Sequence, residues 1–254
     1  MAERNGEIIV ICFYWQGDRW QEEGYKQPKK HVNLLQHHMD RAGQISKDLP
    51  VRYINNLYHG VKRFADREFK FICFTNEYLP GLDPWIMTSS FPMVTDCGVL
   101  PRLFMFSRGA GLFGHQVLCL DIDIIVIGTL KPLMDYEGLF CARSKFAPNE
   151  GYKLDGDIMS FRACEAVEDI FWKPFIANVD AAVELTQGRE RYWIRHVANN
   201  LAHRWDVEAP GSVISYKWHA KGLTHPPQGA SIISCHGMPR PHQIRDKWVK
   251  DYWI

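Results

Sequence analysis

The sequence has no strong excess of either charge and no long hydrophobic run. Its 254 residues include 30 Lys and Arg against 29 Asp and Glu, which gives a formal net charge of +1. A chain without a basic field does not favour a nucleic-acid partner. The longest unbroken apolar run, residues 8–15, is far shorter than the roughly 20 residues that a membrane-spanning helix needs. We therefore expect neither a transmembrane segment nor nucleic-acid binding.

The sequence also lacks paired cysteines. Its seven cysteines include no CxxC pair, and Cys12, Cys73 and Cys119 lie inside apolar segments, where cysteine behaves as a small hydrophobic residue. The start of the chain, residues 1–6, is polar and does not resemble a signal peptide. These features predict a protein of a reducing, cytoplasmic compartment without a disulfide framework or a zinc ribbon.

Two catalytic motifs are missing as well. The sequence has no GxxxxGKS/T, so it does not predict a P-loop, and it has no GxSxG, which weakens an α/β-hydrolase interpretation.

Hydrophobic patterning predicts an α/β fold. Residues 8–14 form a continuous apolar run typical of a strand buried on both faces. Residues 53–65 have the spacing of an amphipathic helix, and residues 69–75 form a second apolar run. Strand, helix and strand in this order make a βαβ unit and favour a mostly parallel, doubly wound sheet. No linker or repeat divides the chain, so one domain over residues 1–254 is expected.

The remaining predicted elements follow the same reasoning. Helices are expected over residues 100–107, 163–175 (ending near Pro174) and 190–201, and strands over residues 117–127 and 232–235. The end of the chain, with Trp248, Tyr252 and Trp253, is expected to dock on the body as a helix, while contact with a membrane surface is the alternative.

Asp121 and Asp123 are the strongest candidates for chemistry. They interrupt the apolar segment 117–127, where burying a carboxylate is costly unless something pairs with it. Side chains at i and i+2 of a strand point to the same side, so both can reach one divalent cation through hard oxygen ligands. The pair predicts a metal site.

A second candidate group follows the last predicted strand. In the run SCHGMPRPH, Gly237 would let backbone and the His236 imidazole approach a ligand closely. Arg240 could form charge-assisted hydrogen bonds to phosphate oxygens.

Several segments in order, GVLPRLFMF, HQVLCLDIDIIVIGTLKPLMDY, GYKLDGDIMSF and SCHGMPRPH, resemble the bacterial glycosyltransferases of the GT-A fold, close to the family 8-like group. The resemblance covers most of the chain. It implies an α/β, Rossmann-like fold whose mostly parallel central sheet is flanked by helices. It also implies a nucleotide-binding half, about residues 1–127, and a half over residues 128–254 that shapes the acceptor side and carries the C-terminal motif.

The resemblance also implies roles for particular residues. The metal ligands would be Asp121, Asp123 and His236, holding Mn²⁺ or Mg²⁺. Contacts with the nucleotide-sugar donor would come from Phe13, Tyr14, Trp15, Arg102, Ile122, Gly237 and Arg240. The catalytic candidates are Asp155, Glu190 and Arg102. The sequence departs from the family pattern in three places. At Arg102 the donor-contacting cation is preserved only by type. The other two are Asp155-Gly156-Asp157 and Gly188-Arg189-Glu190, and for their carboxylates a surface or structural role is the alternative.

The expected function is metal-dependent, retaining transfer of a hexosyl group from a nucleotide sugar, UDP-linked, to a hydroxyl acceptor. The acceptor would be a glycan, a lipid-linked molecule or a protein, as in surface polysaccharide or lipopolysaccharide assembly. Peripheral contact with the inner face of the membrane belongs to this expectation. Two alternatives stay open: a sugar-phosphate nucleotidyltransferase and a catalytically inactive nucleotide-sugar-binding protein.

Overall fold

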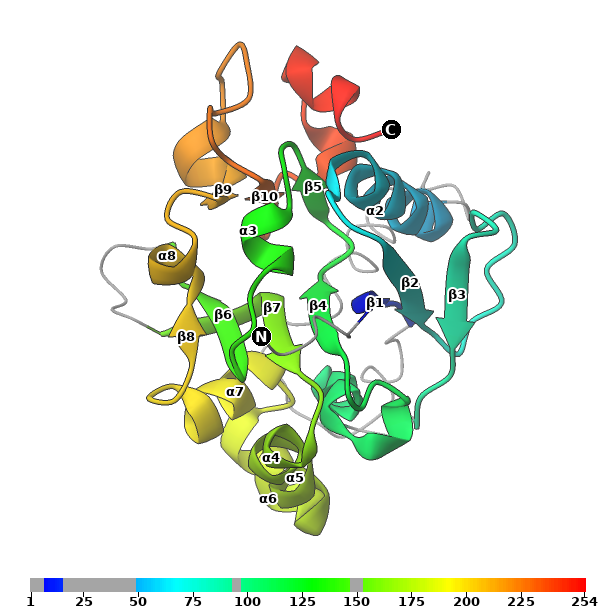
Figure 1. The fold of residues 1–254 in the computed structure, drawn as a ribbon, viewed down its shortest axis with the longest axis vertical. Coiled ribbons are helices and arrows are strands. Elements are labelled where there is room, and N and C mark those ends of the chain that lie inside the picture. Colours follow the sequence, from blue (N-terminus) through cyan, green and yellow to red (C-terminus); the bar gives the residue numbers. More distant parts are fainter. Residues whose placement is uncertain (1–6, 16–48, 93–96, 147–152) are drawn as a thin grey trace, which may run out of the picture.

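The computed structural model describes residues 7–15, 49–92, 97–146 and 153–254. Its main sheet has seven strands in the order β3-β2-β1-β4-β7-β6-β8 (Figure 1). In that order the strands are Ile86–Ser89, Phe69–Phe74, Ile8–Phe13, Gln116–Leu120, Leu154–Arg162, Phe140–Ser144 and His203–Arg204. A second sheet, in the order β5-β10-β9, contains Ile124–Val126, Ile232–Ser234 and Val213–Ser215.

The predicted mostly parallel α/β architecture is confirmed. Strand β1 pairs in parallel with β2 and with β4, and β2 pairs in parallel with β3. The other half of the sheet changes direction, because β7 runs antiparallel to both β4 and β6. This antiparallel pairing brings the end of β4 beside the first half of β7, which matters for the site described below.

The main sheet is covered on both faces, as the continuous apolar run of β1 predicts. Ile8, Val10 and Cys12 pack into the same core cluster as helix α2 (Leu49–Phe64), whereas Ile9, Ile11 and Phe13 pack into another. The second cluster includes residues from the α4–α7 region, which lies at the bottom of Figure 1. The other helical segments are η2 Leu100–Phe106, η3 Arg108–Ala110, α3 Lys131–Met134, α4 Glu165–Val167, η4 Glu168–Trp172, α5 Lys173–Ala177, α6 Val179–Thr186, α7 Glu190–Ala198, α8 Trp205–Glu208, η5 Tyr216–Ala220, η6 Pro241–Gln243 and η7 Lys247–Asp251.

The prediction of one strand over residues 117–127 was wrong. The chain turns at Asp121–Asp123, where the Ile124 N–H donates to the Asp121 carbonyl oxygen at 3.2 Å. Strand β4 before the turn belongs to the large sheet and β5 after it to the small one. The two aspartates therefore lie in a connection between sheets, and the alternation of side chains along a strand does not apply to them.

The predicted helix over residues 163–175 was also wrong in its form and its end. It consists of α4, a π-helical turn η4, and α5, which continues to Ala177. Pro174 lies in the first turn of α5, directly after η4, within a segment that is helical from residue 165 to residue 177. It does not end the helical segment.

The C-terminal segment and the cysteines lie as expected. Trp248 and Trp253 are buried in a third core cluster beneath η7. Cys12, Cys73 and Cys119 are fully buried, and all seven cysteines are free. Across the described residues, none of the helices combines the length and the apolar character needed to cross a membrane.

Candidate active site

The candidate site lies where the large sheet passes into the small one. The Asp121 N–H donates to the Asp157 carbonyl oxygen at 2.9 Å, which continues the antiparallel pairing of β4 with β7. Strand β7 thereby brings Asp155 and Asp157 to the turn that contains Asp121 and Asp123. The surface-turn alternative for the 155–157 segment is wrong, because these residues lie within β7.

Arg102 contacts three other predicted site residues, Asp121, Glu190 and Phe13. Its Nη1 lies 2.6 Å from Oδ1 of Asp121 and 3.2 Å from Oε2 of Glu190, and its Nη2 donates to the Cys119 sulfur at 3.0 Å. Its guanidinium carbon lies 5.9 Å from the centre of the Phe13 ring. Helix η2 supplies the arginine, α7 the glutamate and β1 the aromatic ring, so elements far apart in sequence meet here.

The two carboxylates beside Arg102 are not fully stabilised as anions. Burial raises the pKa of Glu190 to about 7 and that of Asp121 to about 6, and the Arg102 charge only partly opposes this. The neighbouring Asp157 and Asp155 charges raise the pKa of Asp121 further. Oε1 of Glu190 is buried and has no hydrogen-bond partner among the described residues. This side of the site holds more negative charge than Arg102 neutralises.

Arg143 organises the other side of the site, and the sequence did not point to it. Its buried side chain donates from Nε to Oδ1 of Asp157 at 2.5 Å, and its Nη2 lies 3.2 Å from Oδ2 of Asp155. The Ser234 hydroxyl donates to Oδ2 of Asp157 at 2.5 Å. Although burial opposes ionisation, these partners hold the pKa of Asp157 below its usual value.

His236 lies next to this second group. Its Nε2 is 2.7 Å from the Ser215 hydroxyl oxygen, and its ring stacks on Phe146 with centres 5.4 Å apart. The Arg143 guanidinium carbon lies 4.1 Å from the centre of the same Phe146 ring. Burial, with a contribution from the Arg143 charge, lowers the pKa of His236, so the imidazole is neutral at pH 7. A neutral imidazole is the form that binds metal ions.

Asp123 and Arg240 form a buried ion pair that ties the C-terminal motif to the turn after β4. The Arg240 backbone N–H donates to Oε1 of Gln243 at 3.0 Å, which closes the following helical turn. Ile122 is half-buried between the two aspartates, and Gly237 has a positive φ of 71° that favours glycine. Arg240 thus has a carboxylate partner within the protein.

The three predicted metal ligands each have a partner within the protein. Asp121 contacts Arg102, Asp123 contacts Arg240, and His236 contacts Ser215. Within the described ranges, no three His, Cys, Asp or Glu side chains come together in a way suited to a metal ion. Coordination by this set therefore stays a prediction.

The charge of the whole group nevertheless fits a divalent cation. Its five carboxylates outnumber its three arginines by two, which is the charge of one such ion when all the carboxylates are ionised. The carboxylates are those of Asp121, Asp123, Asp155, Asp157 and Glu190, and the arginines are Arg102, Arg143 and Arg240. Carboxylate oxygens are the hard ligands that Mg²⁺ and Mn²⁺ prefer.

Of the aromatic residues predicted to hold the nucleotide base, Phe13 and Trp15 contact each other, whereas Tyr14 lies in the other core cluster. Tyr14 is buried, and the Trp15 ring meets the Phe13 and Phe91 rings edge to face, with centres 6.4 and 5.5 Å apart. Phe13 also stacks on Phe74. Their part in donor binding stays a prediction.

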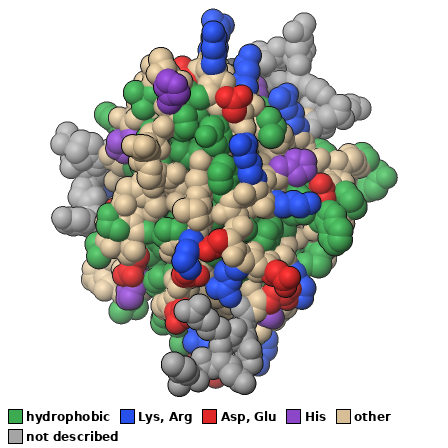
Figure 2. Space-filling model, turned by 45° about the horizontal axis from the view of Figure 1, so that its top comes forward, with side chains coloured by type: hydrophobic (Ala, Val, Ile, Leu, Met, Phe, Trp, Pro, Cys, Tyr) green, Lys and Arg blue, Asp and Glu red, His purple; other side chains and the backbone are tan. Residues whose placement is uncertain are grey.

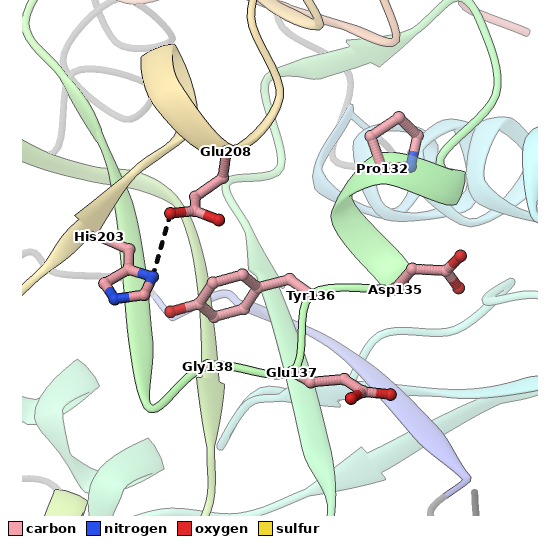
Figure 3. Close-up of a pocket in the computed structure, with 7 residues that line it drawn as sticks. All are labelled: Pro132, Asp135, Tyr136, Glu137, Gly138, His203 and Glu208. Atoms are coloured by element: carbon pink, nitrogen blue, oxygen red, sulfur yellow. Dashed lines mark ion pairs between the residues drawn. The ribbon is translucent and has the colours of Figure 1, made fainter.

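A pocket of about 240 Å³ lies elsewhere, between α3, β8 and α8 (Figure 3). In Figure 3 the Tyr136 ring points toward His203, whose Nδ1 lies 3.1 Å from Oε1 of Glu208. None of the residues predicted to carry chemistry lines this pocket. The candidate active site is therefore the charged group around Asp121.

The comparisons with known proteins agree on the fold. No family model and no curated protein matches the chain. The solved structure of the galactosyltransferase LgtC in complex with donor and acceptor sugar analogues is similar over 96% of this chain and 93% of that one, with a TM-score of 0.59 and 13% identity. The glycosyltransferase GlyE of Streptococcus pneumoniae TIGR4 is similar over 98% of this chain and 59% of its own (TM-score 0.56, 12% identity). The bifunctional glycosyltransferase WbbM is similar over 93% and 47% (TM-score 0.51, 9% identity).

These similarities confirm the expected single-domain GT-A-like α/β fold. Membership of the family 8-like group stays an expectation from the sequence motifs.

Proposed function

We propose that this chain is a glycosyltransferase that moves a hexosyl group from a UDP-sugar to a hydroxyl of a glycan, lipid-linked or protein acceptor. The main support is the charged group around Asp121, whose five carboxylates and three arginines lie on a fold similar to glycosyltransferases over nearly the whole chain. With all five carboxylates ionised, the group has an excess of two negative charges, which suits an enzyme that handles a nucleoside diphosphate together with a divalent cation.

Asp121, Asp123 and His236 are the residues that would hold this cation, Mn²⁺ or Mg²⁺. When bound, the ion would act as a Lewis acid that neutralises charge on the departing diphosphate. The neutral His236 imidazole and the incompletely neutralised Asp121 carboxylate fit such a role.

The protein's own groups would do the remaining work. Arg102, buried over the Phe13 ring, would add positive charge on the donor side as the glycosidic bond breaks. Glu190, whose pKa of about 7 lets it hold or release a proton near neutral pH, and Asp155 would face the transferred sugar and its acceptor.

Other parts of the proposal come from the family resemblance. Phe13, Tyr14 and Trp15 would lie beside the nucleotide base of the donor. The backbone at Ile122 and Gly237 would allow the donor to approach closely. Retention at the anomeric carbon, and a place at the inner face of the membrane in polysaccharide or lipopolysaccharide assembly, come from the same source.

The experiment that tests the proposal is a screen of nucleotide sugars with purified protein, in Mn²⁺ and in EDTA. We expect metal-dependent release of the nucleoside diphosphate from at least one UDP-sugar. Asp169→Asn, a change at an exposed residue of η4, should leave this release unaltered. Production of a nucleotide sugar and pyrophosphate from a nucleoside triphosphate and a sugar phosphate would instead establish the nucleotidyltransferase alternative, which the structural similarities do not favour. Metal-independent binding of UDP without any release would establish the inactive binding protein.

A further inference from the structure

Lys217 lies beside the C-terminal motif and differs from the three arginines of the site. A Cβ atom added at Gly237 would lie 2.6 Å from the Lys217 Nζ, so the ammonium group is directly over the Gly237 backbone. No carboxylate in the described part of the chain forms an ion pair with Lys217, whereas Arg102, Arg143 and Arg240 each contact at least one. Lys217 therefore lies beside the charged group as a separate cation that has no ion-pair partner among the described residues.

The fold holds Lys217 at this position. Strand β9 pairs in parallel with β10, with Ser215 opposite Ser234, so Lys217 and Gly237 follow two neighbouring strand ends. The Ser215 hydroxyl contacts His236, and the Ser215 N–H donates to Nδ1 of His219 at 3.0 Å, which fixes the start of η5. Lys217 is thus placed by the same contacts that place His236.

The surroundings of Lys217 favour an anionic ligand. Lys217 is an exposed residue, but desolvation of its ammonium group lowers the pKa of that group, and the Cys235 thiol is the neighbour that opposes this. On the face drawn in Figure 2, Lys and Arg side chains lie toward the top and also farther down, where Asp and Glu side chains lie among them. An incoming anion would regain for the ammonium group the charge interactions that desolvation removes.

We propose that Lys217 binds the diphosphate of the donor at the Gly237 backbone. This inference rests on the proposed function, since it takes a nucleoside diphosphate as the ligand. Arg240, the cation expected from the sequence to contact the diphosphate, is already paired with Asp123. A lysine ammonium group is a compact point charge with three N–H donors and is a common phosphate ligand.

The test is to compare Lys217→Gln with Lys221→Gln, a matched change at an exposed lysine just after the same helical turn. Calorimetry with UDP, UMP and uridine, in Mn²⁺ and again in EDTA, separates the diphosphate contact from contacts with the nucleoside. Lys217→Gln should weaken UDP binding about tenfold to a hundredfold, since hydrogen bonds to charged groups are among the stronger ones. Uridine binding should not change, Lys217→Arg should keep most of the UDP affinity, and Lys221→Gln should behave like wild type.

The outcomes separate the two proposals. Wild-type protein that binds UDP more tightly than uridine, with Lys217→Gln unchanged in both, would overturn the Lys217 assignment and leave the proposed function standing. Equal weakening of UDP and uridine would also overturn it, because the effect would then be a general loss of the site. Wild-type protein that binds none of UDP, GDP or ADP would overturn the proposed function and the assignment with it.

Discussion

Two arginines of the site each contact two carboxylates, with opposite results. Arg143 and Ser234 give Asp157 short hydrogen bonds, and the pKa of that carboxyl falls below its usual value. Arg102 contacts Asp121 and Glu190, yet the pKa of both rises. The difference lies in the additional partners, because both Asp157 oxygens accept hydrogen bonds, whereas Oε1 of Glu190 has no partner in the described part of the chain.

The groups around Arg143 and Arg102 therefore differ in how completely their carboxylates are neutralised. The Arg143 group is a completed internal network that fixes β6, β7 and β10 to one another. The Arg102 group is incomplete and has negative charge that a cation or a proton can still neutralise. We expect the two groups to respond differently to the same kind of substitution.

The largest expected effect is on stability when Arg143 is removed. Arg143→Leu leaves the buried Asp157 and the half-buried Asp155 without their cation, and breaking a buried ion pair such as Arg143–Asp157 costs about 3–5 kcal/mol. Arg102→Leu should cost less at pH 6, because the pKa values of Asp121 and Glu190 let both carboxyls take up protons in that range. Urea denaturation in EDTA measures both variants. Equal losses would contradict the distinction between the two groups.

The next effect is a pH dependence that belongs to Glu190. Its folded pKa of about 7 lies above the ordinary value of 4.5, so the folded state binds this proton more tightly. The stabilisation is complete below pH 4.5 and is lost as the pH rises through 7. Between pH 5 and 8 the unfolding free energy of wild type should therefore fall by about 2–3 kcal/mol relative to Glu190→Gln.

Glu184→Gln is the control, since it changes an exposed glutamate of α6. Urea denaturation in EDTA across the pH range gives the comparison, and EDTA prevents a bound ion from replacing the proton. Parallel curves of unfolding free energy against pH for wild type and Glu190→Gln would show that folding does not raise the pKa of Glu190.

Loss of charge at Asp121 should affect turnover more than stability. Asp121→Asn preserves the shape of the side chain but removes one ligand charge, and we expect turnover to fall about a hundredfold. The fold should survive, because burial already disfavours the ionised carboxyl. Nucleoside diphosphate release and the melting temperature are the two measurements, with Asp169→Asn as control. Near-normal release would remove Asp121 from the active site.

The sequence predicted the first sheet strands and α2 because their hydrophobic periodicities are strong. It could not reveal the turn at residues 121–123, since β4 and β5 are both buried and their residues form one apolar run. The residue types around Asp121 indicated a charged site. The ion-pair and hydrogen-bond partners of its carboxylates could not be predicted from the sequence, because they depend on which strands pair.

Arg143 shows most clearly which part of the site could not be predicted from the sequence. It was visible as a lone cation within the apolar-flanked segment FCARS. Its contacts with Asp155 and Asp157 depend on the antiparallel register of β6 with β7, which shifts between Ala142 and Arg143. No local pattern in the sequence encodes that shift, and without it neither Arg143 nor the role of Asp157 could be inferred.

The smallest expected effect tests why Asp157 is so well stabilised. Ser234→Ala removes the hydroxyl that donates to Oδ2 of Asp157 and leaves that oxygen buried, which should cost about 1–3 kcal/mol at pH 7. Because the hydrogen bond lowers the pKa of Asp157, this loss should shrink as the pH falls through the folded pKa and the carboxyl becomes protonated. Ser89→Ala, a change at a half-buried serine of the edge strand β3 whose hydroxyl contacts a backbone carbonyl, is the control. A loss for Ser234→Ala that does not vary with pH would mean that Arg143 alone holds the Asp157 carboxylate.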